Sequence, residues 1–198
     1  MRRPVGLSLA TVAPSIPPGS IVLWRAGWRP SQRVIAADGR CTYSHVEMVA
    51  SGLFPQLLGF VATGPVRHSL SAMVREYPGR LDLYEPVPAV AEAHGDSWDG
   101  IGAVDEMAAQ IARGKGYGWW HLARLAVRRV PMLRLVMPRS TDKANGRRPR
   151  TMFCSHAVAR ACRIGGGFDA VPRLADWETQ PADLARSLFF RFAGRLEP

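Results

Sequence analysis

The amino-acid sequence predicts an α+β fold built around a single hydrophobic core. Segments typical of β-strands come first along the chain and segments typical of helices come later, without the alternation of βαβ units. The sequence contains no internal repeat. The chain has 198 residues, of which 47% are hydrophobic, so it is long enough to bury one core. We therefore expect one domain over residues 17–198, preceded by an N-terminal arm over residues 1–16.

Hydrophobic periodicity and turn residues define the expected elements. Short runs of β-forming residues bounded by turns predict strands over residues 21–24, 43–49, 57–64 and 81–87. Helical spacing, N-cap residues and terminating Gly or Pro predict helices over residues 31–38, 69–77, 97–113, 119–130 and 180–190. Residues 138–150 have the composition of a loop, so we expect a basic helical and loop excursion at about 114–150.

The segment "CTYSHVEMVAS" contains the most informative strand. Strict alternation places one set of side chains on one face of this strand: Tyr43, His45, Glu47 and Val49. His45 and Glu47 are then roughly 7 Å apart along the backbone. The strand therefore presents an imidazole and a carboxylate on the same side.

A cysteine opens a helical pattern in "TMFCSHAVARAC", residues 151–162. If Cys154 lies at the N-terminus of that helix, unpaired backbone N–H groups and the helix dipole stabilise its thiolate. The same N–H groups can bind a developing oxyanion. Cys154 is therefore a candidate nucleophile.

The base that would serve Cys154 must come from another part of the chain. His156 is two residues away, and residues two apart on a helix point to nearly opposite sides. His45 is the best candidate, because Cys–His sites bring the two residues together through the fold. A buried cysteine and a histidine at the edge of a core would produce the same pattern.

Six segments taken in order resemble a known family: "GSIVLWR", "YSHVEMV", "GPVRHSLSAMV", "GKGYGWWHLARL", "FCSHAVARA" and "QPADLARSLFF". They resemble the circularly permuted NlpC/P60, or papain-like, cysteine hydrolases, particularly the YiiX/YebB-like group. The resemblance spans roughly residues 17–190. "YSHVEMV" looks like the family's SHVGI strand, and "FCSHAVARA" looks like its CSELV helix start. The histidine precedes the cysteine in the chain, as in that family.

The resemblance implies a permuted papain-like fold with an antiparallel sheet packed against helices. It makes Cys154 the nucleophile and His45 the base, and it matches Tyr117 to a tyrosine that shapes the site, with Tyr43 as a second such candidate. The family usually supplies a third polar group, from the next strand, to orient the histidine. Here the candidates for that orienting group are Glu47, Thr63 and His68.

Basic residues are concentrated in the later half of the chain. The formal net charge is +10, and the segment Arg124–Arg150 is rich in arginine. Such a segment is attracted to polyanions, which include anionic cell-wall polymers, anionic membrane surfaces and nucleic acids. A nucleic-acid role is the least favoured, because the segment lacks a recognised binding motif. A solvated basic loop without a specific partner fits the same composition.

The sequence gives no sign of a cofactor. The three cysteines show no CxxC spacing, so neither a zinc ribbon nor a disulfide framework is expected. Residue types alone would permit a metal site from His45, His68 and Cys154, but no spacing supports one. The opening "MRRPVGLSLATVAPSIPP" only weakly imitates a secretory signal, and no stretch approaches the ~20 apolar residues of a membrane span. Cytoplasmic, phage-associated and cell-envelope locations all remain open.

These observations predict a cysteine hydrolase that cleaves an amide or ester through an acyl-thioester. A peptidoglycan peptide is the first choice of substrate, because a basic surface favours an anionic polymer. A lipid amide or ester hydrolase, or an acyltransferase of the same fold, is the second. A non-catalytic component of a phage tail or secretion assembly is the competing class.

Overall fold

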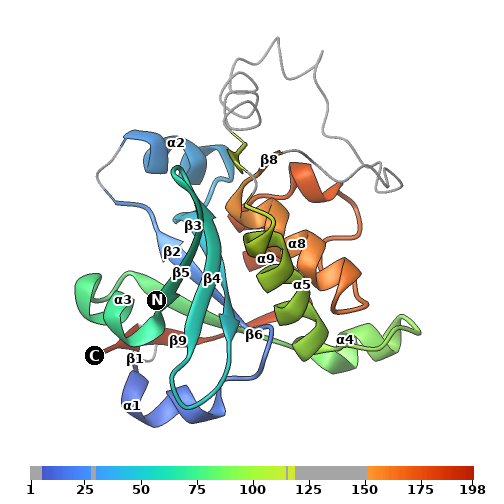
Figure 1. Cartoon of the computed structure of the whole chain (residues 1–198), viewed down its shortest axis with the longest axis horizontal. Coiled ribbons are helices and arrows are strands. Elements are labelled where there is room, and N and C mark those ends of the chain that lie inside the picture. Colours follow the sequence, from blue (N-terminus) through green and yellow to red (C-terminus); the bar gives the residue numbers. More distant parts are fainter. Residues whose placement is uncertain (1–5, 28–29, 115, 119–150) are drawn as a thin grey trace.

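Most of the chain forms one mixed sheet with helices on both faces. The structure is a computed structural model, and it describes residues 6–27, 30–114, 116–118 and 151–198. The sheet has seven strands in the order β1-β9-β6-β2-β3-β4-β5. All neighbouring pairs are antiparallel except β1 and β9, which run parallel. The fold is thus α+β, with a mostly antiparallel sheet packed against helices (Figure 1).

The elements have the following bounds. The strands of the large sheet are β1 (Gly6–Ser8), β2 (Ile21–Arg25), β3 (Tyr43–Ala50), β4 (Gln56–Val61), β5 (Gly64–Ser69), β6 (Leu81–Pro86) and β9 (Phe190–Glu197). A separate parallel pair consists of β7 (Gly116–Tyr117) and β8 (Thr151–Met152). The helices are α1 (Leu9–Val12), α2 (Pro30–Asp38), α3 (Leu70–Glu76), α4 (Pro88–Ala93), α5 (Gly100–Ala112), α8 (Cys154–Ile164) and α9 (Pro181–Ala185). Two 3-10 turns, η1 (Ala13–Ser15) and η2 (Asp176–Glu178), complete the set.

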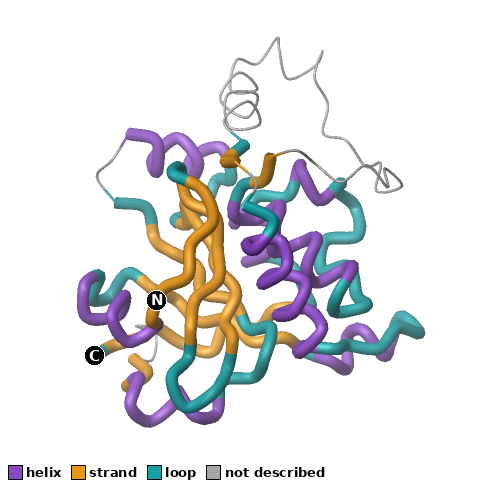
Figure 2. Tube along the Cα trace, viewed as in Figure 1, coloured by secondary structure: helices purple, strands orange, loops and turns teal. Residues whose placement is uncertain are grey.

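Two apolar clusters, one on each face of the sheet, hold these layers together. Helices α5, α8 and α9 cover one face, and α1 and α3 lie on the other side (Figures 1 and 2). Val46 and Met48 of β3 belong to the cluster under α8, whereas Val49 of the same strand belongs to the cluster under α3. Alternation along β3 therefore serves both cores, because the sheet is buried on both faces.

Several predicted elements are confirmed. Strands β2, β3, β4 and β6 lie where the β-forming runs predict them, and α2, α3, α5 and α8 lie in or at the start of the predicted helical segments. Ser69 caps α3 by accepting a hydrogen bond from the Ala72 N–H, and Asp99 caps α5 by accepting one from the Gly102 N–H. The helix predicted over residues 119–130 lies outside the described residues.

Five strands were not predicted: β1, β5, β7, β8 and β9. A turn at Ala62 and Thr63 leads into β5, which begins at Gly64 with a φ of +126° and pairs with β4. The helix expected over residues 180–190 ends at Ala185. Ser187 Oγ then donates to the Ala170 carbonyl and accepts from the Phe189 N–H, which fixes a turn. The chain continues as β9, because pairing with β6 outweighs the local helical pattern.

The region expected as an N-terminal arm, residues 1–16, contains β1, α1 and η1. Leu9 and Ile16 are buried in the cluster under α3. No helix in the described part of the chain combines the length and the apolar composition that crossing a membrane requires.

Candidate active site

Cys154 is the first residue of α8. The residue before it, Phe153, is extended at φ −124° and ψ 169°, so the chain turns into the helix directly at the cysteine. The Ser155 backbone N–H, one of the groups left unpaired at a helix start, donates to the sulfur. Cys154 is 3% exposed. The local geometry is that expected for a thiolate held at a helix N-terminus.

A second backbone donor comes from the edge of β3. The pairing of β3 with β4 covers only Met48–Ala50, so the earlier half of β3 leaves that edge open. The Val49 N–H bonds to Ser20 on the opposite side, and N–H groups an odd number of residues apart on a strand point to opposite edges. The Val46 N–H therefore faces the open edge, where it donates to the Cys154 sulfur. The sulfur lies where β3 and β4 separate.

His45 and Cys154 are joined by a side-chain hydrogen bond. Burial alone would raise the pKa of the Cys154 thiol, but the His45 imidazolium and the two backbone N–H groups lower it. Burial alone would lower the pKa of His45, but the Cys154 thiolate and the Glu47 carboxylate raise it to about 10. Both shifts are in the direction that favours a thiolate–imidazolium pair over a neutral thiol and imidazole.

Glu47 lies on the far side of the His45 ring. Its Oε1 is 3.5 Å from His45 Nε2 and 3.9 Å from His68 Nε2. The Glu47 side chain is completely buried, and within the described part of the chain neither of its oxygens has a well-aligned hydrogen-bond partner. Since Nε2 of His45 faces Glu47, Nδ1 is the ring nitrogen left for the thiol. Glu47 is therefore placed to orient the imidazole.

A glycine on the neighbouring strand makes room for Glu47. A Cβ added to Gly59 of β4 would lie 2.6 Å from Glu47 Cγ. Any larger residue would therefore push the carboxylate away from its position. Sequence reasoning missed Gly59, because its effect depends on which residues lie beside it in the sheet.

A cavity of about 440 Å³ opens onto this group. His45, Glu47, His68 and Tyr117 all line it, together with residues of α2, the β4–β5 turn and α3. Cys154 is not among the lining residues. Burial, followed by the nearby Cys154 charge, raises the pKa of Tyr117, so this hydroxyl stays protonated.

Two other predicted site residues lie elsewhere. Thr63 is exposed in the turn between β4 and β5 and does not line the cavity. Tyr43 was expected on the face of His45, and that expectation is wrong. A bulge between β2 and β3 shifts the register, so Tyr43 belongs to the cluster under α8 and its hydroxyl bonds to Asp82.

The cavity also has walls that the sequence analysis did not assign. Trp24 pairs with His45 across β2 and β3, and the two rings meet edge to face with centroids 5.8 Å apart. Tyr77, at the end of α3, packs on the other side of Trp24 with ring centroids 5.1 Å apart. The predicted strand at 21–24 contained Trp24, but only the register shows that it lies opposite His45.

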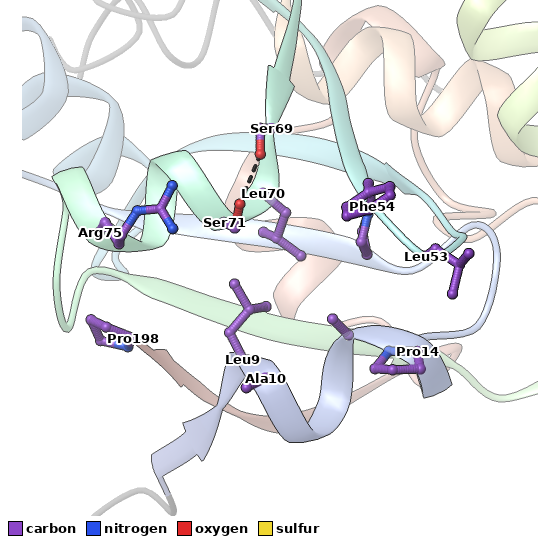
Figure 3. Close-up of a pocket in the computed structure, with 12 residues that line it drawn as sticks. Leu9, Ala10, Pro14, Leu53, Phe54, Ser69, Leu70, Ser71, Arg75 and Pro198 are labelled. Atoms are coloured by element: carbon purple, nitrogen blue, oxygen red, sulfur yellow. Dashed lines mark hydrogen bonds between the residues drawn. The ribbon is translucent and has the colours of Figure 1, made fainter.

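A separate apolar groove of about 340 Å³ lies next to the first turn of α3 (Figure 3). Leu9, Pro14 and Leu70 line it, and Leu53 and Phe54 at its rim are each 85% exposed. Helix α3 divides the two hollows, because Ser71 and Arg75 line the groove whereas Met73 and Glu76 line the cavity.

Comparison with solved structures supports the fold. The chain is similar to the metalloprotein yiiX from Escherichia coli O157:H7, with a TM-score of 0.51 and 11% sequence identity. The similarity covers 92% of this chain and 99% of that one. No protein-family model matches the sequence, and the search of curated proteins found no match. At this identity the likeness establishes the overall fold, which is consistent with a YiiX-like arrangement.

Residue types alone would permit a metal site at His45, His68 and Cys154. Across the described ranges, no group of three or more His, Cys, Asp or Glu side chains is arranged to hold a metal ion. In this arrangement His45 has the Cys154 thiol on one side and the Glu47 carboxylate on the other.

Proposed function

We propose that this chain is a cysteine hydrolase with a permuted papain-like fold, in which Cys154 is the nucleophile, His45 the acid and base, and Glu47 the orienting group. The observation that carries the proposal is the row from thiol to imidazole to carboxylate, assembled from α8 and β3. The resemblance of "YSHVEMV" and "FCSHAVARA" to the permuted NlpC/P60 family supports it independently.

The proposed reaction has two stages. The Cys154 thiolate attacks the acyl carbon and forms a C–S bond, and the Ser155 N–H at the start of α8 stabilises the developing oxyanion. His45 gives its proton to the departing amine or alcohol, which leaves a neutral imidazole and a thioester. His45 then takes a proton from water as that water attacks the thioester, and the thiolate is released with the acid product.

The substrate is proposed from chemistry that the site shares with its relatives. Amide bonds of peptidoglycan peptides are the first choice, and lipid amides or esters are the second, with an acyltransferase as the variant in which another acceptor replaces water. The cavity offers both aromatic walls, from Trp24 and Tyr77, and polar groups, from Gln32 and Arg80. Such a mixture suits a peptide stem with apolar and polar parts.

We also propose that the basic segment Arg124–Arg150 recruits an anionic polymer or membrane surface. This segment lies outside the described residues, and the support is its charge alone. Attraction of this kind is screened over ~8 to 10 Å at physiological salt, so recruitment should weaken as salt rises.

The test of the proposed function compares the two cysteines of α8. Both are buried, but burial raises the pKa of Cys162, followed by the effects of Asp169 and Asp176, whereas the pKa of Cys154 is lowered. Iodoacetamide at pH 7 should therefore alkylate Cys154 first, as measured by peptide mass mapping. Cys154→Ala should abolish turnover of a p-nitrophenyl ester and of a peptidoglycan peptide, and Cys162→Ala should leave turnover within about twofold of the wild-type rate.

Two outcomes would contradict the proposal. Retained turnover in Cys154→Ala would mean that another group carries the reaction. Slow, unselective alkylation together with absent turnover in the wild-type protein would favour the non-catalytic binding component.

A further inference from the structure

The Glu47 carboxylate lies between two imidazoles, and the proposed reaction uses only one of them. We propose that His68 is a positioning residue that acts through Glu47, with its imidazolium holding the carboxylate in place throughout the catalytic cycle. This inference rests on the proposed function. It assigns a role to a side chain that does not contact Cys154 or the substrate's reacting atoms.

The charge balance of the site supports a second cation. In the thiolate–imidazolium form that the proposed reaction starts from, the row carries two negative charges, on Cys154 and Glu47, and one positive charge, on His45. After acylation the sulfur is a neutral thioester and His45 has given up its proton, so Glu47 still carries an unbalanced negative charge. A buried carboxylate is costly unless it is paired. The row therefore has one excess negative charge both before and after acylation.

His68 is the group placed to balance that charge. Among the described residues, the side chains within ion-pair distance of Glu47 are His45 at 3.5 Å and His68 at 3.9 Å. The arginines that line the same cavity are engaged elsewhere, because Arg25 pairs with Asp82 and Arg80 donates to the Arg25 carbonyl. The His68 side chain is 32% exposed, whereas the Glu47 side chain is completely buried.

The order of the strands and a glycine on β4 allow the Glu47 and His68 side chains to meet. His68 is on β5 opposite Leu57 of β4, so a whole strand separates it from β3. Neighbouring strands are about 4.8 Å apart, and Glu47 must therefore reach across β4. It does so over Gly59, which has no side chain to obstruct it. The contact between Glu47 and His68 thus depends on a glycine in the intervening strand.

The experiment measures kcat and KM for a p-nitrophenyl ester in His68→Gln, which keeps a hydrogen-bond donor but cannot carry the charge. We expect kcat to fall about tenfold with KM within about twofold, because His68 acts on Glu47 and the small ester needs few contacts with the cavity wall. His68→Lys should restore much of the rate, since it returns a cation. His94→Gln is the matched control and should be silent, because His94 is an exposed residue at the end of α4.

A double-mutant cycle shows whether His68 acts through Glu47. In a Glu47→Gln background, His68→Gln should change kcat by less than about twofold, because there is no longer a carboxylate to hold. A tenfold loss in that background, or unchanged kcat in the His68→Gln single variant, would overturn the inference. Neither result would affect the proposed function, which is tested separately by the reactivity of Cys154 and by turnover in Cys154→Ala. Thermal melts of each variant show that the losses are not due to unfolding.

Discussion

Two carboxylates are buried in the same sheet, and they are held in opposite ways. Asp82 on β6 is 1% exposed, and three groups approach its oxygens at 2.9 Å: Arg25 Nη1, Arg195 Nε and the Tyr43 hydroxyl. Glu47 on β3 is completely buried, but the nearest charged groups are two imidazoles at 3.5 and 3.9 Å. The centre of the sheet thus has a satisfied ion network, and the open edge beside α8 has a poorly satisfied one.

The difference separates a structural region from a functional one. A buried charge with good partners on every side is stable and inert, because any movement of its partners costs free energy. A buried charge whose partners can lose a proton is less stable but can respond to a reaction beside it. Arginine stays charged at every accessible pH, whereas an imidazole can gain or lose a proton, so the two carboxylates have partners of different chemistry.

The largest expected effects come from neutralising each carboxylate in turn. Asp82→Asn should lower the free energy of unfolding by about 3 to 5 kcal/mol, because it leaves two part-buried arginines unpaired. Glu47→Gln should cost less stability but should lower kcat about 100-fold, since His45 loses the group that orients it. Urea unfolding and ester turnover measured on both variants make each the control for the other. Equal losses of stability in the two variants would remove the distinction between the regions.

A smaller effect should appear in the pH dependence of stability. The folded pKa of His45 is raised to about 10 and that of Cys154 is lowered, whereas unfolded His and Cys titrate near 6.5 and 8.5. Between about pH 6.5 and 8.5 the folded pair and the unfolded pair hold the same number of protons, so the stabilisation is constant. Above pH 8.5 the unfolded chain has released the proton that His45 still holds, and stability falls until pH passes about 10.

The comparison to make is wild type against the double variant Cys154→Ala/His45→Gln, in which neither position titrates, and against Asp82→Asn. Between pH 8.5 and 9.5 the wild-type protein should lose about 1 kcal/mol more than the double variant, as measured by urea unfolding. Asp82→Asn should follow the wild-type slope, because arginine does not titrate in this range. A parallel slope in the double variant and wild type would mean that the folded Cys154–His45 pair holds no proton that the unfolded pair has lost.

The sequence predicts the three residues Cys154, His45 and Glu47 better than it predicts what surrounds Glu47. Alternation along residues 43–49 places His45 and Glu47 together, and the helix start places Cys154 among free N–H groups, because both depend on local periodicity. The structure brings Cys154 and His45 within hydrogen-bond contact, and the catalytic use of that contact remains a proposal. The environment of Glu47 could not be predicted, since it depends on Gly59 and His68 from two other strands.

Register also explains the predictions that were wrong. One bulge between β2 and β3 moves Tyr43 to the opposite face, where it bonds to Asp82, and no local pattern marks that bulge. The helix predicted over residues 180–190 was too long for a similar reason. The chain after it forms β9, and the pairing of β9 with β6 depends on a strand about 100 residues earlier in the chain. Local patterns predict elements, and strand pairing decides which side chains meet.

The smallest expected effect comes from the glycine under Glu47. Gly59→Ala adds a methyl group 2.6 Å from Glu47 Cγ, so the carboxylate must move or the strands must separate. We expect a loss of about 1 to 3 kcal/mol in unfolding free energy and a fall in kcat of a fewfold.

Truncating the acid tests whether the methyl group acts on Glu47. In a Glu47→Ala background the side chain ends at Cβ and has no Cγ for the added methyl to meet, so Gly59→Ala should cost less stability than it does in wild type. The single variant Glu47→Ala provides the reference stability. If Gly59→Ala costs the same in both backgrounds, the methyl group disturbs the strand itself, and Gly59 belongs with the structural half of the sheet beside Asp82.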